Sequence, residues 1–588
     1  MKLLAALCAI VLLSGQAVAA EPVWRIATTP NYRILSQLND RETADWMRDF
    51  DQYILSVSDL LRMDIRQLPP LTVVVFARDK DYTPYKLMRP NGSTANVSGQ
   101  FIARQTWSMI AMAYDALDDQ SRRAIHHEAT HWLMSIDQAA QPAWFSEGIA
   151  ELFSTFERRG DKVAWGKPIA DHLLTLKDSG LMPLEAFLEQ PSALFDRDDH
   201  TEQFYAQAWA FTHFLMFSDN FSRRPLMIKF LQTYRTESGE ATVKAVFGQS
   251  LPDTEHAFHV YVNERRWTYA MEPVKVAADP PPLQGAPPAV VQASLGFLAL
   301  GAGRPELAKQ HADRSVELDG AAAEGHALLA YLAQDGNHFD QAATEADAAL
   351  QLGSRDSGLY MLLGDSYADG ANSLKPDAQR TRVSMYENAI NLSPWRIDAY
   401  DRLSEALFSL DKPRPEDAKF LSVGIRAYPG DDWLRVGNAV VTERLGRRDE
   451  AMQAIDAVLR PDSKLDPQQR DFASNVRNRW LIGDLNSELA EATNKHDFTG
   501  ARAILARYRD RIGTNAQTDA YLKDIEARLS QSELMARYQS LIQDKKKAEA
   551  RAVAEQLLAI PDLPAPMRRY VEQQLAAAGK GSAAGHSE

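Results

Sequence analysis

The chain has 588 residues, of which 65 are Lys or Arg and 79 are Asp or Glu, so its formal net charge at pH 7 is −14. This acidic balance argues against a nucleic-acid partner, which would require at least a basic patch. The chain is too long for one hydrophobic core, so two or more domains are expected.

Residues 1–20 are predicted to be a cleavable secretory signal. Lys2 precedes an apolar run, and the segment ends in the small residues Ala17-Val18-Ala19-Ala20, which are typical of a cleavage site. No later apolar segment reaches membrane length, so the mature chain should contain no transmembrane segment. We expect export, to the periplasm in preference to the medium. The single cysteine, Cys8, lies in the signal, so the mature chain can form no disulfide.

From residue 23 onward the sequence pattern predicts a small α/β lobe. Strands are expected over 24–28, 71–76, 100–102 and 107–114, and a long helix over 41–61. A loop that contains Pro84, Pro90 and Gly92 separates the second strand from the last two.

The next predicted helix carries the pattern His127-Glu128-Ala129-Thr130-His131. Residues four apart lie on one helix face, so His127 and His131 can offer imidazole nitrogens to a single cation. Glu128 lies roughly 100° around the helix, where it can act as general base on a metal-bound water. Because the pattern arises by chance in roughly 2% of chains of this length, its surroundings must support it.

A second predicted helix, capped near Ser146, supplies further acidic residues. A catalytic zinc site usually has three protein ligands and one open position. We predict Glu147 as the third ligand of one Zn²⁺ per chain, and Glu151 as the acceptor that orients a ligating histidine. The alternative is two carboxylates on a solvated helix face, which the neighbouring Trp144 and Phe145 make costly.

The HExxH pattern followed by WFSEGIAE at 144–151 resembles the gluzincin clan of zinc metallopeptidases. The resemblance covers about residues 23 to 270 and implies an α+β zincin-like domain, with a small mixed sheet, the metal helix and a helical lower lobe. The spacer between His131 and Glu147 is shorter than in thermolysin. The G-x-M-E-N stretch of membrane-alanyl-type aminopeptidases is missing, so the resemblance does not imply aminopeptidase specificity.

The resemblance also implies a substrate strand and an oxyanion donor. In gluzincins the strand before the metal helix forms the upper rim of the cleft, where an extended peptide can pair with its open edge. That strand consists of Trp107, Ser108, Met109, Ile110, Ala111, Met112 and Ala113. An interior strand is an equal alternative. Tyr205 is the candidate oxyanion donor, the alternative being a packing role, and His200 and His213 are weaker candidates.

Six prolines at 273–288 predict an extended linker, and internal repeats follow it. Gly296, Ala330 and Gly364 are 34 residues apart, as are Ala308 and Ala342. This is the tetratricopeptide (TPR) period, with small residues where paired helices touch. We predict an all-α, TPR-type superhelical solenoid over 289–578, whose concave surface would bind a protein partner, and a disordered tail at 579–588.

Two functions fit these features. The first is an exported zinc peptidase, with residues 21–272 as its catalytic domain and a peptide or protein as substrate. The second is a TPR interaction scaffold whose zincin-like module has lost turnover. A decayed site would typically lack a ligand or the base, whereas His127, His131, Glu147 and Glu128 are all present, which favours the enzyme.

Overall fold

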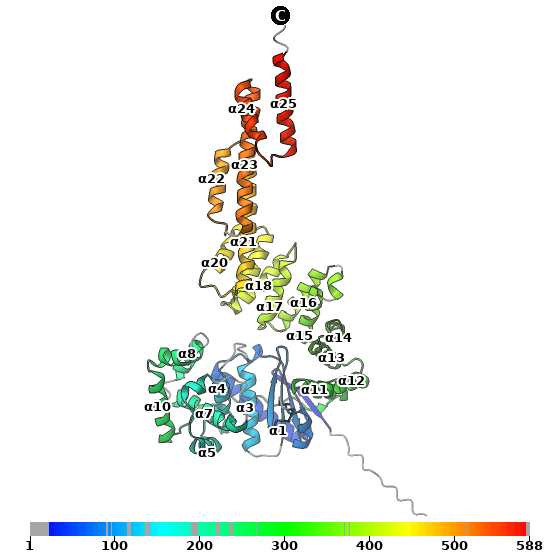
Figure 1. The fold of residues 1–588 in the computed structure, drawn as a ribbon. Coiled ribbons are helices and arrows are strands. Elements are labelled where there is room, and N and C mark those ends of the chain that lie inside the picture. The colour runs from blue at the N-terminus through cyan, green and yellow to red at the C-terminus, as the bar shows by residue number, and fades with distance from the viewer. Residues whose placement is uncertain are drawn as a thin grey trace, which may run out of the picture. The chain divides into compact units, whose positions relative to one another are not determined.

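The computed structural model of the protein describes residues 23–583, apart from gaps at 90–91, 96, 115–118, 136–141, 190–197, 219–223, 235–238, 266, 370, 376 and 514–515. The predicted signal at 1–20 therefore lies outside the described residues. The chain divides into two compact units, Met1–Ala399 (unit 1) and Tyr400–Glu588 (unit 2) (Figure 1). No helix in the described part of the chain has the length and apolar character needed to cross a membrane.

Unit 1 is built around a six-stranded sheet with the order β4-β5-β3-β2-β1-β9. Strands β2, β3 and β5 are parallel, and the other three are antiparallel to their neighbours. The strands are β1 (Arg25–Thr28), β2 (Tyr32–Ser36), β3 (Leu71–Phe76), β4 (Gly99–Ala103), β5 (Ser108–Ala113) and β9 (Gln284–Gly285). Strand β2 was not predicted; the turn residues Pro30 and Asn31 before Ile34 and Leu35 are the signal for it.

Helices cover both faces of this sheet. Strands β3 and β5 are apolar along almost their whole length, as is typical of strands buried on both sides. One face packs against α1 (Asp40–Leu61) and α3 (Asp119–Met134), which place Phe50 and Trp132 in one core with Val73. On the other face, Val74 shares a core with Leu298 of α11 (Pro288–Gly301). The short α2 (Asp79–Tyr82) lies between β3 and β4 in the chain.

A lower lobe follows α3. It contains α4 (Ala143–Ser154), α5 (Ala170–Ser179), α6 (Leu184–Leu188), α7 (Asp198–Phe217), α8 (Arg224–Tyr234), α9 (Gly239–Phe247) and α10 (Leu251–Glu264). The expectation that the chain is helical beyond Glu151 is wrong in part, because a second sheet combines β6 (Glu157–Arg159), β7 (Lys162–Trp165) and β8 (Ala270–Pro273). The β6–β7 hairpin turns at Gly160, whose φ of 66° is the backbone conformation such turns favour.

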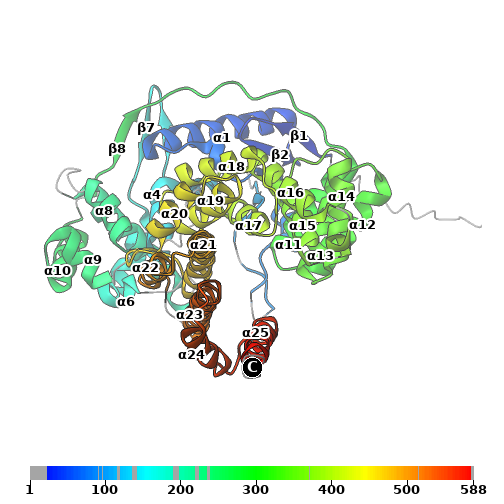
Figure 2. The same cartoon turned by 90° about the horizontal axis from the view of Figure 1, so that it is seen from above.

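The proline-rich segment after β8 is extended, as predicted, and runs along α1 (Figure 2). The Gln52 side chain of α1 donates to the carbonyl of Lys275 (2.8 Å) and accepts from the backbone N–H of Ala277 (3.2 Å). The segment ends in β9, which pairs with β1. It is therefore fixed to the surface of unit 1.

The predicted repeats are TPR-type helix pairs. In unit 1 they are α11 with α12 (Pro305–Leu318), α13 (Ala323–Asp335) with α14 (Phe339–Gln351), and α15 (Ser357–Asp369) with α16 (Ala378–Leu392). A Cβ added at Gly296 would lie 2.2 Å from Leu328, and one at Gly364 would lie 2.5 Å from the Tyr386 ring. Small residues are therefore required where the helices touch, as the 34-residue spacing predicts.

The predicted domain boundary at 273–288 differs from the division into compact units, which falls between Ala399 and Tyr400. The first repeats belong to unit 1 because they bury one face of the sheet. Polar contacts add to this packing: Thr106 hydrogen-bonds to Tyr331 (2.8 Å), and Arg104 forms an ion pair with Asp335 (3.2 Å).

The remaining helices follow in unit 2, apart from the start of α17. They are α17 (Ile397–Phe408), α18 (Pro415–Ala427), α19 (Asp432–Arg444), α20 (Arg448–Val458), α21 (Pro467–Asn494), α22 (Phe498–Arg509), α23 (Ala516–Gln543), α24 (Lys547–Leu558) and α25 (Ala565–Ala583). At 28 residues each, α21 and α23 are far longer than the helices of the first repeats. Helix α25 includes the first half of the segment predicted to be a disordered tail, and residues 584–588 lie outside the described part.

Candidate metal centre

Helices α3 and α4 carry the residues of the HExxH pattern and the acidic residues that follow it. The phenol of Tyr53 in α1 donates to the carbonyl of His126 (2.8 Å), which fixes α3 against α1. Helix α4 begins after Pro142, so Ser146 lies in its first turn. The prediction that Ser146 caps this helix is therefore wrong. The Ser146 hydroxyl instead lies 3.3 Å from Nδ1 of His131.

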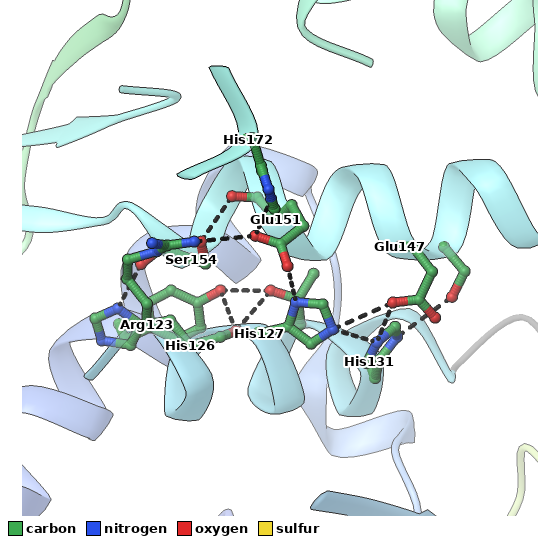
Figure 3. A network of polar contacts seen from close by, with 11 residues as sticks. Arg123, His126, His127, His131, Glu147, Glu151, Ser154 and His172 are labelled. Carbon is green, nitrogen blue, oxygen red and sulfur yellow. Dashed lines mark hydrogen bonds and ion pairs between the residues drawn. The ribbon is translucent and has the colours of Figure 1, made fainter. Parts of the chain in front are cut away.

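Three predicted ligand atoms converge between the two helices (Figure 3). Nε2 of His127 lies 3.0 Å from Nε2 of His131, and Oε2 of Glu147 lies 3.2 and 3.4 Å from these two nitrogens. A point about 2.0 to 2.1 Å from all three atoms exists, because the circle through them has a radius of about 1.9 Å, and this is the zinc-to-ligand distance. The donor set and its spacing therefore fit a zinc ion.

The charges around this point favour a cation. Oε2 of Glu147 is buried and has no hydrogen-bond partner among the described residues. Burial alone raises the pKa of Glu147, but the imidazoles of His131 and His127 outweigh it and lower the pKa to about 2. Burial lowers the pKa of His127, but Glu147 and Glu151 raise it well above its ordinary value. The lowered pKa of Glu147 favours its negative charge, and the raised pKa of His127 favours a positive charge beside it. A metal ion bound between these groups would supply that positive charge.

Glu151 lies behind His127, as predicted, and joins a larger network (Figure 3). Its Oε1 lies 3.3 Å from Nδ1 of His127, where it can accept the hydrogen of this N–H. Nε2 of the same ring faces His131 and Glu147. Its Oε2 lies 3.1 Å from Nε2 of His172 in α5 and 3.3 Å from Arg123. His172 and Arg123 were not predicted, because neither belongs to a motif and only folding brings α5 to α4.

Glu128 and Tyr205 lie beside the cluster, as predicted. Both line a cavity of about 500 Å³ together with the three ligands. Tyr205 approaches from α7, with its ring centroid 6.2 Å from that of His127. Burial and the carboxylates of Glu147 and Glu128 raise the pKa of Tyr205 well above its ordinary value, so the phenol keeps its proton at neutral pH.

The cavity continues on the other side of the cluster. A second cavity of about 610 Å³ shares Val97, Gly99, His127, Glu128 and Tyr205 with the first. The apolar residues that line only the first side are Leu87, Phe101 and Met134. The second side carries the charged or titratable residues Arg123, Asp171, His172 and Glu202. The cluster thus lies where the two cavities meet, in one cleft.

The prediction that Trp107 through Ala113 offers an open edge to substrate is wrong. Strand β5 is an interior strand, paired with β3 on one side and β4 on the other, and all six of its residues are buried. The edge strand is β4, whose Gly99, Gln100 and Phe101 line the cleft. The β4–β5 hairpin is the reason, because it folds back and covers the edge of β5.

Two other histidines have structural positions. His126 faces away from the cluster, is 1% exposed and stacks on the Tyr53 ring at a centroid distance of 4.2 Å. His213 is fully buried and contacts the Tyr261 hydroxyl and the carbonyls of Gly166 and Thr268. Neither can serve as a donor to substrate. The side chain of His200 lies outside the described part.

No protein-family model matches the chain, and no curated protein matches it. Part of the chain is similar to solved structures. These include YrrB, described as a TPR protein with an unusual peptide-binding site (17% identity, 32% of this chain and 92% of the other, TM-score 0.27). A second is Pseudomonas aeruginosa PilF (16% identity, 40% and 97%, TM-score 0.23), and a third is the thermophilic TPR protein TTC0263 of Thermus thermophilus (18% identity, 32% and 97%, TM-score 0.21). At these values the matches do not bear on the metal centre.

Proposed function

We propose that this protein is an exported, zinc-dependent peptidase. The observation that carries the proposal is the convergence of two imidazole nitrogens and one carboxylate oxygen at mutual distances of 3.0, 3.2 and 3.4 Å. They lie in a cleft that also contains a free carboxylate, Glu128, and a protonated phenol, Tyr205. Export is proposed from the signal at 1–20 alone.

Each residue of the centre has a chemical role in this proposal. A zinc ion held by His127, His131 and Glu147 would polarise a substrate carbonyl and lower the pKa of a bound water toward 7. Glu128 takes the proton of the attacking water and passes it to the departing amine. Tyr205 donates its hydroxyl hydrogen to the oxyanion that forms on the carbonyl.

The peptide would bind along β4. Among the described strands β4 pairs only with β5, so its other side can offer main-chain groups for hydrogen bonds with an extended segment. Gly99 lies at the cluster: a Cβ built there would be 3.7 Å from the Glu128 side chain. A peptide paired with β4 would therefore pass beside the general base.

The proposal predicts that Glu128→Gln separates metal binding from hydrolysis. The amide keeps the size of the carboxylate but accepts no proton, so we expect about one zinc per chain to remain and kcat to fall on the order of 10² to 10⁴-fold. Zinc is measured by mass spectrometry of the metal, and cleavage with a quenched fluorescent peptide library.

Glu157→Gln, a half-buried position on β6 that lines neither cavity, is the matched control and should change neither quantity. If Glu128→Gln kept full hydrolytic activity, the proposed role of Glu128 as general base would be wrong. A wild-type chain that binds zinc and cleaves no peptide would instead favour the scaffold function.

The helices of unit 2 are proposed as the part that contacts a protein partner. In unit 1 the repeats are already engaged, because α11 and α13 pack against the sheet of the same unit. The sheet therefore covers the surface of α11 and α13 that a partner would otherwise contact. We therefore take helices α18 to α25 of unit 2 as the candidates for partner binding.

A further inference from the structure

Unit 1 contains a cavity of about 650 Å³ at the end of the sheet opposite the metal centre. Tyr32, Leu71 and Ser108 lie side by side as the first residues of β2, β3 and β5, and all three line the cavity. The metal centre lies at the other end of these strands, since Gly99 pairs with Met112 near the end of β5. The six residues of β5 span roughly 17 Å, so the cavity is separate from the cleft.

The opposite wall of the cavity comes from the helical repeats. Ser294 and Phe297 of α11, Glu324 and Ala327 of α13, and the segment before α15 contribute to it. Trp107 packs edge-on against Phe297, with ring centroids 5.2 Å apart. With Trp395, these aromatic rings form an apolar lining of the kind that small binding sites use.

Buried polar atoms in this lining lack partners. Oγ of Ser108 and Oγ of Ser294 have no hydrogen bond to any described residue, although the two residues are only 1% and 2% exposed. Nε of Arg33 is also without a partner, while its guanidinium contacts Glu324 at 3.1 Å. Each such atom costs free energy unless something bonds to it, so the cavity is suited to a ligand with hydrogen-bonding groups.

One of the arginines at the cavity has no ion-pair partner among the described residues. Arg66 is paired with Asp64, and Arg33 is paired with Glu324. The carboxylate of Asp356 accepts from the Tyr331 hydroxyl (2.7 Å) and from the backbone N–H of Gly358 (2.8 Å). The guanidinium of Arg355 is exposed and forms no ion pair with any residue that the structure describes. An anionic group can therefore bind there with the geometry that Arg and carboxylate share.

We propose that this cavity binds the carboxyl-terminal residues of a peptide whose last side chain is large and apolar. The side chain would lie among Trp107, Phe297 and Trp395, and the terminal carboxylate would pair with Arg355. The unpartnered hydroxyls of Ser108 and Ser294 would hydrogen-bond to the peptide main chain. Three residues of the strand predicted to hold substrate, Trp107, Ser108 and Met109, thus line a second site instead of the cleft.

The test uses the full mature chain carrying Glu128→Gln, so that the probe stays intact whether or not the protein is a peptidase. The probes are N-acetyl-Ala-Ala-Phe with a free carboxylate and the same peptide as its C-terminal amide, titrated by calorimetry. We expect the free acid to bind on the order of tenfold or more tightly than the amide, because only the acid pairs with Arg355.

Arg355→Gln should bring the acid down to the affinity of the amide. Arg314→Gln, an exposed arginine on α12, is the matched control and should leave the difference intact. Phe297→Ala should weaken both probes, with thermal unfolding used to confirm that the variant is folded. Binding of the acid should persist in the presence of a zinc-directed hydroxamate, because the cavity is separate from the cleft.

The proposal is overturned by equal binding of acid and amide, or by no effect of Arg355→Gln. It is also overturned by displacement of the probe by the hydroxamate, or by no binding of either peptide at millimolar concentration. N-acetyl-phenylalanine binding as tightly as the tripeptide would also overturn it, because the site would then recognise a small acid and no peptide main chain.

Discussion

Glu147 and Glu151 lie one helical turn apart on α4 and contact different nitrogens of the same histidine, His127. Glu147 faces Nε2 of His127, and Glu151 faces Nδ1 of the same ring. The two carboxylates thus fix the orientation of the ring from both sides. The second of them is itself held by His172 and Arg123, so the position of His127 depends on residues from three helices.

We predict that Glu151→Ala weakens zinc binding without removing a ligand. The N–H of His127 loses its acceptor and the ring loses its fixed orientation, so zinc affinity should fall about 10- to 100-fold. Competition with a chelator of known affinity measures this change. Glu157→Ala, which removes a carboxylate that pairs with Arg159 and Lys167 and lines neither cavity, is the control. Unchanged zinc affinity in Glu151→Ala would show that His127 is oriented by packing alone.

Tyr205→Phe is predicted to affect turnover and spare the metal. Removing the hydroxyl removes the donor to the oxyanion, so kcat should fall on the order of 10² to 10³-fold while zinc content and KM change little. Steady-state kinetics on one cleaved peptide gives both constants. Tyr269→Phe, at an exposed ring, serves as control. A fall in zinc content with Tyr205→Phe would assign this residue to packing, the alternative considered from the sequence.

At the level of elements, the contact between α4 and α7 sets the position of Glu147. Gly148 follows Glu147 and lies against α7: a Cβ added there would be 2.1 Å from Oγ1 of Thr212 and 2.4 Å from the carbonyl oxygen of Ala208. Only glycine permits this approach. The same approach brings Tyr205, on α7, to the cleft.

Gly148→Ala should therefore cost both stability and metal affinity. The methyl group must push α4 away from α7, which we expect to lower the free energy of unfolding by about 1 to 3 kcal/mol. Because α4 carries Glu147, zinc affinity should fall in the same variant. Urea unfolding and chelator competition measure the two effects. Gly320→Ala, where the nearest atom to the added group is the carbonyl oxygen of Val316 at 3.9 Å, an ordinary contact, should change neither. A fully stable Gly148→Ala protein would contradict the packing described for α4.

At the level of the whole chain, the first repeats complete the core of the domain that carries the candidate metal centre. Leu35, Val74 and Met109 of the sheet are at most 2% exposed and share a core with Leu298 and Leu328 of the repeats. Without these helices the sheet would present an apolar face to water, which soluble domains avoid.

A truncated chain tests this dependence. A fragment of residues 21–272, the catalytic domain as predicted from sequence, should aggregate or unfold without cooperativity, whereas 21–399 should be monomeric and unfold cooperatively. Size-exclusion chromatography and thermal circular dichroism distinguish the two. A monomeric 21–272 fragment with wild-type zinc affinity would show that the repeats are dispensable for the metal centre.

Local spacing was enough to predict that His127 and His131 share one helix face with Glu128 beside them, and that the repeats recur at 34 residues, because neighbours on one helix face are set by helix geometry. The candidate ligand Glu147 was predicted from the second motif. Other features could be identified only in the folded chain. They are the edge strand, the contacts of His172 and Arg123, the cavity at Arg355 and the packing of the repeats on the sheet. They depend on which strand lies outermost and on which helices meet, and those contacts join residues far apart in sequence. Such contacts leave no periodic pattern in the sequence, so they are determined by tertiary packing and can be seen only in the structure.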